Sequence, residues 1–500
     1  MWALVILTFL ACVCVIAFLY LTWNFNYWKS RHVTGPKPTV IKGSFPKTFG
    51  GVCNLVEELH QIYLRYRDTQ SFVGVYSARS PKLFILDPKL AVSVLKSKFN
   101  SFRDNESSLW TSQQVEKLRF CSPFVSVGDE WKKKRTELAQ LVSTKALRSH
   151  SDIMKACAKR MTEFLNTRKP NSTWDVKDVA NRFTCAVMTQ FIWGMDENTF
   201  QKEMEYSPSH NIATIMLQQS LRCVKHYGRT ACFPFLRRFF PVRFFPAAAE
   251  DYFRRLAREA LQGNIVGHSS VMSRLSYLNQ KNDLTDMQVA GHTTTILIDG
   301  FETAAIVISH CLLMLARNQR VQRKLRARLN ECAESLAFDE ITTNTYLNQC
   351  IQETLRLFPP LATLFKICTE SVTLENGLSN SCIELNPGDI VYISSYSFHH
   401  DPKYYDEPEK YWPERFDDEL GGVKKYKDMG VFLPFGDGPR MCPGMKLALM
   451  EVKIALMELV RHFEFVPSDD TRTDNKLDSD SFLLKLHGDI LLKINPTPNI

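Results

Sequence analysis

The chain has 500 residues, of which 45% are hydrophobic and 23% charged, and its 62 basic against 53 acidic residues give a formal net charge of +9. This composition can bury a large core, and it excludes a disordered or low-complexity protein. Length alone suggests about three domains, although single domains of this size also occur. The basic excess is mild and no nucleic-acid motif accompanies it, so we expect no nucleic-acid partner.

The fourteen cysteines are scattered singly along the chain, without a CxxC pair. The only two that lie close together, Cys12 and Cys14, belong to the hydrophobic N-terminal stretch. Isolated cysteines are typical of proteins in a reducing compartment. We therefore expect free thiols and no disulfides in the main body of the protein.

The N-terminal stretch carries no charged side chain from Met1 to Tyr27 and is almost wholly apolar from Trp2 to Leu21. About twenty such residues span a bilayer as a helix. A cleavable signal peptide is the alternative, but that class begins with a basic region and has a shorter apolar part. We therefore predict an uncleaved transmembrane signal anchor at residues 1–24.

Residues 25–40 follow as a basic, Gly- and Pro-containing hinge. The first positive charges, Lys29, Arg31 and Lys37, come after the apolar stretch, which predicts that the rest of the chain faces the cytoplasm. The run from Gly35 to Pro38 has the composition of a stiff connection.

Hydrophobic periodicity beyond the hinge indicates mostly helices with a few short strands. The expected elements, in chain order, are short strands from Phe72 to Leu86, helices over most of Leu90 to Leu357, short strands and turns from Ala362 to Ile393, a helix from Met445 to His462, and a tail that alternates like a hairpin.

Two basic blocks, Lys132–Arg135 and Lys424–Lys427, suit an acidic protein partner or a lipid surface, and each is equally compatible with a solvated face. The first block lies in an expected helix in which Trp131 and Arg135 are four residues apart. This pair has the spacing to bracket a cofactor carboxylate, although Trp and Arg on a helix surface more often pack together.

The segment from Phe233 to Pro246 alternates aromatic residues, prolines and three arginines. Aromatic and basic side chains together are typical of a membrane interface. A buried loop is the alternative, and the arginines disfavour it. We therefore expect this segment to contact the membrane.

One expected helix is much longer than the others. A capping box at Thr285–Gln288 begins it, and apolar spacing continues to about Arg317. The run Asp299-Gly300-Phe301-Glu302-Thr303 interrupts this apolar stretch. A glycine in mid-helix costs about 1 kcal/mol against alanine, which a ligand lying against the backbone would explain. An acid beside a hydroxyl can relay protons; the alternative is a kink with Thr303 bonded back to a carbonyl.

Glu353 and Arg356 are three residues apart on an expected helix from Tyr346 to Leu357, so they share one face. Taken alone, such a pair is most simply an exposed ion pair of little energetic importance. Further along, Arg415 lies in a rigid, aromatic-rich segment and has the geometry to share the Glu353 carboxylate bidentately.

The most specific pattern is the loop from Leu433 to Gly444, in which Phe435, Arg440 and Cys442 stand among glycines and prolines. A soft thiolate on such a loop can ligate a heme iron, and Arg440 can bind a propionate. The dipole of the following helix favours an anionic sulfur, while Pro443 supplies no N–H to it. A buried cysteine in a glycine turn is the alternative interpretation.

Together these motifs strongly resemble a cytochrome P-450, a heme-thiolate monooxygenase, over nearly the whole chain. The details are most similar to insect-type microsomal members. The loop matches the pattern Phe-x-x-Gly-x-Arg-x-Cys-x-Gly. The resemblance implies that Cys442 ligates the iron of heme b, with cofactor-binding roles for Phe435, Arg440, Trp131, Arg135, Lys366 and Gly300, proton delivery by Glu302 and Thr303, and a structural ion triad of Glu353, Arg356 and Arg415.

The resemblance also implies the fold: a mainly α structure with a small β-region, in which a helical prism surrounds a buried heme and residues 41–500 form a single catalytic domain. It implies insertion of one oxygen atom from O₂ into small lipophilic substrates such as xenobiotics, lipids, or steroid- or terpenoid-like hormones. NADPH electrons are then expected through a reductase on a basic proximal face, with a small membrane cytochrome b as a second partner and the endoplasmic reticulum membrane as the location.

Two positions depart from the family pattern. Asp299 stands where the family usually has Ala or Gly; it either pairs with a neighbouring base, which we expect, or binds a cationic part of a substrate. Lys366 stands where many members have a propionate-binding Arg, and a lysine can bind as a point charge.

Two other functions remain open from the sequence. One is a heme-thiolate isomerase or dehydratase that needs no reductase, and Thr303 and the basic blocks weigh against it. The other is a non-catalytic heme- or lipid-binding membrane protein, which the combination of Cys442 with Glu302 and Thr303 disfavours.

Overall fold

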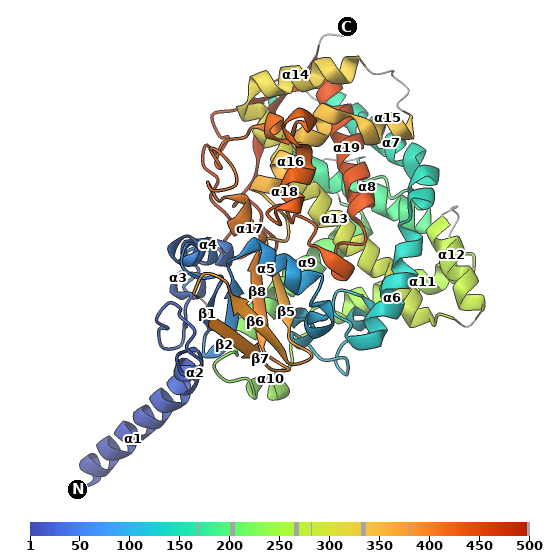
Figure 1. The fold of residues 1–500 in the computed structure, drawn as a ribbon. Coiled ribbons are helices and arrows are strands. Elements are labelled where there is room, and N and C mark those ends of the chain that lie inside the picture. The colour runs from blue at the N-terminus through green and yellow to red at the C-terminus, as the bar shows by residue number, and fades with distance from the viewer. Residues whose placement is uncertain are drawn as a thin grey trace.

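The computed structural model describes the chain except residues 168, 170, 201–205, 265–269, 282, 332–336, 380 and 498–500, and describes no side chain at residues 229, 238 and 270. Helices form most of the molecule and gather around one long central helix, with most of the labelled strands grouped to one side (Figure 1). The fold class expected from the sequence, mainly α with a small β-region, is therefore confirmed.

The helices up to residue 280 are α1 (Trp2–Thr22), α2 (Tyr27–Ser30), α3 (Pro46–Phe49), α4 (Leu55–Tyr66), α5 (Pro88–Leu95), α6 (Gly128–Leu141), α7 (Thr144–Asn166), α8 (Val176–Trp193), α9 (Pro208–Arg229), α10 (Leu236–Phe239), α11 (Ala247–Leu261) and α12 (Ser270–Gln280). Those that follow are α13 (Asp286–Arg317), α14 (Gln319–Asn330), α15 (Phe338–Thr343), α16 (Thr345–Leu357), α17 (Ser395–His399), α18 (Gly422–Asp428) and α19 (Met445–His462).

The strands form three small sheets. The largest has the order β1-β2-β8-β5-β3, in which only the pairing of β2 with β8 is parallel. A second sheet has the order β4-β10-β9, so the expected pairing within the tail is confirmed, and β6 pairs with β7. The strands are β1 (Phe72–Ser77), β2 (Ser80–Ile85), β3 (Asp104–Asn105), β4 (Ser172–Asp175), β5 (Thr363–Ile367), β6 (Val372–Asn376), β7 (Ser381–Leu385), β8 (Ile390–Ser394), β9 (Phe463–Pro467) and β10 (Leu491–Pro496).

The long helix α13 begins where its capping box predicts. The Thr285 side chain accepts from the Gln288 N–H, and the Gln288 side chain accepts from the Thr285 N–H at 2.8 Å. The helix continues for 32 residues through the core, where most of its side chains are buried. It packs against α8, α11 and α19, and therefore forms the central support of the molecule.

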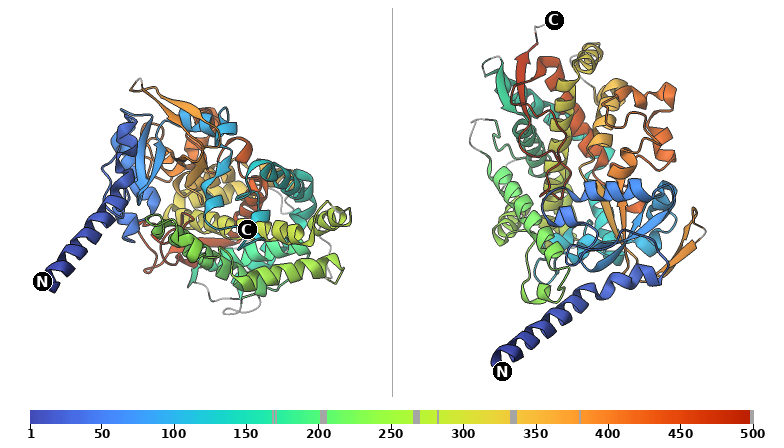
Figure 2. Two further views of the ribbon diagram at one scale, coloured as in Figure 1. Left: turned by 90° about the horizontal axis from the view of Figure 1, so that it is seen from below. Right: turned by 90° about the vertical axis from the view of Figure 1, so that its left-hand side faces the viewer.

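The N-terminal helix α1 projects from the body, and none of its 21 residues is buried (Figures 1 and 2). It is long and apolar enough to cross a membrane. The segment after it is fastened to the sheet, because the Trp28 indole N–H donates to the Val75 carbonyl at 3.1 Å. Gly35 lies so close to Gly74 that an added Cβ would stand 1.9 Å from the Gly74 oxygen.

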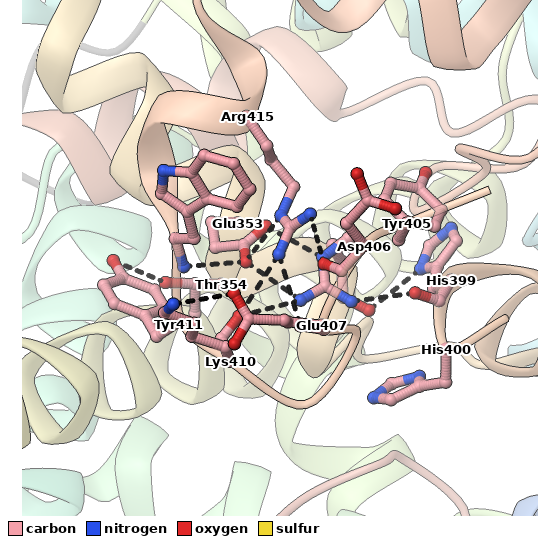
Figure 3. A network of polar contacts seen from close by, with 12 residues as sticks. Glu353, Thr354, His399, His400, Tyr405, Asp406, Glu407, Lys410, Tyr411 and Arg415 are labelled. Atoms are coloured by element: carbon pink, nitrogen blue, oxygen red, sulfur yellow. Dashed lines mark hydrogen bonds and ion pairs between the residues drawn. The ribbon is translucent and has the colours of Figure 1, made fainter. Parts of the chain in front are cut away.

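The three residues of the predicted ion triad meet in the core between α16 and the segment before α18 (Figure 3). Arg356 binds the Glu353 carboxylate bidentately, with Nε–Oε2 at 2.8 Å and Nη2–Oε1 at 2.9 Å. Arg415 adds a single bond to Glu353, from Nε to Oε1 at 3.1 Å. From the sequence we expect Arg415 to bind the carboxylate bidentately, but the bidentate partner is Arg356. The side chains are 0–2% exposed, which rules out the exposed surface pair.

The remaining donors of the two arginines bond to backbone carbonyls. Arg356 donates to the His399 carbonyl at 2.8 Å, and Arg415 donates to the Asp406 carbonyl at 2.9 Å. The Trp412 N–H completes the network by donating to Glu353 at 2.9 Å. Because every charge is paired, the triad fixes the 406–416 segment against α16 and α17.

Replacing Glu353 by Gln should destabilise the protein strongly, because two buried guanidinium groups then lose their anion. We expect Glu353→Gln to lower the free energy of unfolding by about 3 kcal/mol or more, measured by urea denaturation. The matched control is Glu331→Gln, which removes an exposed pair with Arg328 at 3.0 Å and should change stability by no more than about 0.5 kcal/mol. Equal effects of the two substitutions would contradict the structural role of the triad.

Candidate active site

A cavity of ≈ 380 Å³ lies between α13 and the loop that carries Cys442. Side chains from α6, α9, α13, β5 and the start of α19 line it, together with residues 481–485 of the C-terminal segment. Most of this lining is apolar, which suits a lipophilic ligand or a flat apolar cofactor. All nine residues predicted to serve catalysis or cofactor binding line this one cavity: Trp131, Arg135, Gly300, Glu302, Thr303, Lys366, Phe435, Arg440 and Cys442.

The cysteine loop is closed by its own backbone. The Cys442 N–H donates to the Phe435 carbonyl at 2.9 Å, which brings the two ends of the motif together. Gly438 has φ +71°, and an added Cβ would lie 1.9 Å from the Leu95 carbonyl oxygen, so only glycine fits there. Asp437 is held by Lys96 at 2.8 Å. The loop is thus fixed against the end of α5.

Cys442 lines the cavity and is partly exposed, with its thiol away from bulk water. Burial raises the pKa of this thiol to about 11, although the N–H groups of Gly444 and Met445 donate to the sulfur and favour the thiolate. Two donors are therefore present in spite of Pro443, which has none. At neutral pH the thiol therefore keeps its proton unless a cation such as a metal ion binds directly to the sulfur and displaces that proton.

Arg440 connects the cysteine loop to the segment before α6. Its guanidinium donates to the Pro123 carbonyl at 2.8 Å and the Ser126 carbonyl at 2.9 Å, and it pairs with Asp104 at 3.2 Å. It also lies 4.6 Å from the centre of the Trp131 ring. Its buried Nε has no partner in the part of the chain that the structure describes, and this donor is available to an anionic ligand.

Two further basic groups stand in the same cavity. Arg135 makes no hydrogen bond or ion pair with any described residue, and burial lowers its pKa. Lys366 donates to the Asn105 side chain at 2.9 Å, and burial followed by the repulsion of Arg440 lowers its pKa to about 7. A guanidinium without a partner among the described residues, an orphan Nε on Arg440 and a nearby lysine have the chemistry to bind the anionic carboxylates of a heme.

On α13, the hydroxyl of Thr303 donates to the carbonyl of Asp299 at 2.5 Å. This is the bond back to the helix that the sequence left open as the structural alternative, and α13 is continuous through it. Gly300 has a packing reason, because an added Cβ would lie 2.5 Å from the Met188 sulfur of α8. The expected explanation, a ligand against the backbone, is therefore not the only constraint on this glycine.

The side chain of Glu302 is ion-paired with Lys485, whose Nζ lies 3.1 Å from Oε1. Lys485 belongs to the C-terminal segment between β9 and β10, and the sequence analysis did not identify it. The same is true of Asp104, which holds Arg440. No local motif marks either residue, since both contacts join segments that are far apart in the chain.

Asp299 has no hydrogen-bonding or charged partner among the described residues, so the expected pairing with a neighbouring base is wrong. Its side chain is exposed only to the cavity, on the wall opposite Cys442. Burial away from bulk water raises the pKa of its carboxyl to about 7.

Comparison with known proteins agrees with this geometry. Residues 34–492 match the family model described as cytochrome P-450. The chain is 33% identical to the probable cytochrome P-450 28d1 of Drosophila melanogaster, over 97% of each protein. It is 27% identical to cytochrome P-450 3A11 of Mus musculus, over 96% of this chain and 95% of the mouse protein.

The cavity thus combines a thiol, basic groups for an anionic cofactor and an acid–alcohol pair, in a chain whose residues 34–492 match one family. The protein belongs to the cytochrome P-450 family, as an insect-type, heme-dependent monooxygenase.

Proposed function

We propose that this monooxygenase inserts one oxygen atom of O₂ into small lipophilic substrates and takes the two electrons from NADPH through a membrane reductase. The other oxygen atom leaves as water, with one proton from NADPH and one from solvent. The observation that carries this proposal is that Glu302 and Thr303 line the same apolar cavity as the Cys442 thiol. Xenobiotics, lipids, and steroid- or terpenoid-like hormones are the substrate classes that such a cavity suits.

When bound, heme b supplies the redox-active iron at which O₂ is activated. Cys442 would hold the iron through its sulfur, and the N–H groups of Gly444 and Met445 would stabilise the thiolate. The orphan Nε of Arg440 and the free guanidinium of Arg135 would hold the propionates. Lys366 and Trp131 support this end of the cavity.

The acid–alcohol pair would carry protons into the cavity. Glu302 is held by Lys485, which fixes its carboxylate at the cavity wall. Thr303 already donates its hydrogen to the helix, so its oxygen is free to accept a hydrogen bond from the cavity side. A proton entering at Glu302 then has an acceptor on the same stretch of α13.

Exposed lysines around the cysteine loop would bind the acidic surface of the reductase, and of a small membrane cytochrome b. Lys132 and Lys133 are exposed on α6, while Lys134 and Arg135 of the same block point inward. Lys446 is exposed in the first turn of α19, next to the loop. Attraction between opposite charges would orient the electron donor toward Cys442.

The surface beside α1 would lie in the membrane of the endoplasmic reticulum, with the catalytic part in the cytoplasm. Phe235, Phe239 and Phe240 are 56%, 69% and 63% exposed, in and around α10. Phe233 stacks on Tyr20 of α1 at 5.4 Å, so this patch adjoins the anchor, and both lie at the same end of the molecule (Figures 1 and 2). Aromatic side chains beside a spanning helix are typical of the interfacial region.

The reaction is tested by adding purified reductase, NADPH and lipophilic candidate substrates to the protein in lipid vesicles. We expect NADPH consumption coupled to an oxygenated product, and Thr303→Ala should lower the product formed per NADPH severalfold because a proton carrier is lost. The matched control is Thr293→Ala, on the same helix, whose hydroxyl bonds back to the Val289 carbonyl at 3.1 Å and lies outside the cavity.

No NADPH consumption with any lipophile would contradict the monooxygenase proposal. It would favour the isomerase or dehydratase, or a protein that binds heme or lipid without catalysis.

The membrane patch is tested without α1, none of whose residues is buried. The experiment uses a chain that begins at residue 24 and measures its binding to lipid vesicles by co-sedimentation. Replacing Phe235, Phe239 and Phe240 by Ser should weaken this binding about tenfold or more, because the three rings no longer bury apolar surface in the membrane. The control replaces Leu378 and Leu420, which are 53% and 54% exposed elsewhere, by Ser. A similar loss in the control would show that the patch has no special role.

A further inference from the structure

The charged side chains that line the cavity are nearly all paired. Glu302 is paired with Lys485 at 3.1 Å, and Asp437 with Lys96 at 2.8 Å. The charged residues of the lining are the bases Arg119, Arg135, Lys366, Arg440 and Lys485 and the acids Asp299, Glu302 and Asp437.

The bases other than Lys485 are also accounted for. Arg119 donates through Nη2 to the Ser107 carbonyl at 3.0 Å, lies 4.1 Å from the centre of the Phe244 ring and is attracted by Glu116, while its Nη1 has no hydrogen bond among the described residues. Arg440 and Lys366 have the partners described above. Arg135 has no bonding partner among the described residues, and an anionic cofactor edge would satisfy it. None of these bases bonds to Asp299 among the described residues, and burial is the one effect that shifts the pKa of its carboxyl.

Asp299 is the unpaired acid of the described lining. Its carboxyl faces the cavity one turn before Thr303, on the wall opposite Cys442. An acid in an apolar cavity without hydrogen bonds either stays protonated or requires a cation. Ionising this carboxyl costs free energy unless a ligand supplies a compensating positive charge.

We propose that Asp299 makes this enzyme selective for lipophilic substrates that carry a positively charged amine. The ammonium pairs with the Asp299 carboxylate, and the hydrocarbon part lies against the apolar wall. The aromatic rings of Phe124 and Phe482, which also line the cavity, suit a cation. This inference rests on the proposed function only in taking lipophilic molecules as substrates.

Binding by the holoenzyme tests the proposal without any turnover. The probes are 4-phenylbutyltrimethylammonium and its neutral carbon isostere, 5,5-dimethylhexylbenzene. The quaternary nitrogen has no lone pair, so it does not ligate iron. Equilibrium dialysis should show that Asp299→Asn, which keeps the side-chain shape, weakens binding of the cation about tenfold or more and leaves the neutral probe within about twofold.

The control variant is Asp437→Asn, whose acid also lines the cavity and already has the half-exposed Lys96 as its partner at 2.8 Å. It should keep the preference for the cation over the isostere. An unchanged preference in Asp299→Asn, or an equal loss in both variants, would overturn the proposal. A further contrary result is a changed resting absorption spectrum of Asp299→Asn with an unchanged preference for the cation. That result would mean that the carboxylate interacts with the iron and not with the substrate, and it also overturns the proposal. Absence of NADPH turnover leaves this binding result intact, so the two proposals fail separately.

Discussion

Burial of the Cys442 sulfur in an apolar cavity is the constraint on which the arrangement of the site depends. The thiol has a pKa of about 11, so two N–H donors at the start of α19 do not by themselves hold a thiolate. A metal cation bound to the sulfur changes that balance. The loop is correspondingly rigid, since Gly438 touches the Leu95 carbonyl and the Cys442 N–H is bound to Phe435.

The charges around this sulfur are divided between two separate tasks. The triad of Glu353, Arg356 and Arg415 is fully paired and lies outside the cavity lining, so its role is to fix the chain behind the site. Arg440 and Arg135 instead line the cavity and keep donors that have no partner among the described residues. Paired charges therefore provide rigidity, and unpaired charges provide binding capacity.

Much of this organisation follows from local sequence. The capping box predicts where α13 begins, and the fixed spacing around Cys442 predicts the ligand loop. Other features depend on segments that meet only in the folded chain. Lys485 reaches Glu302 from the C-terminal segment, and Met188 of α8 restricts Gly300. That Asp299 has no partner among the described residues could not be predicted either, because the sequence of α13 does not specify which side chains of other segments lie near it in the cavity.

The central claim is that the Cys442 sulfur would hold the iron of a bound heme. Its most direct test is the absorption spectrum of the reduced, CO-bound protein in the Cys442→Ser variant, with Cys382→Ser, which changes an exposed thiol, as the control. The account predicts that the red-shifted band typical of a thiolate ligand is present in the control and absent from Cys442→Ser. A red-shifted band that persists in Cys442→Ser would contradict it.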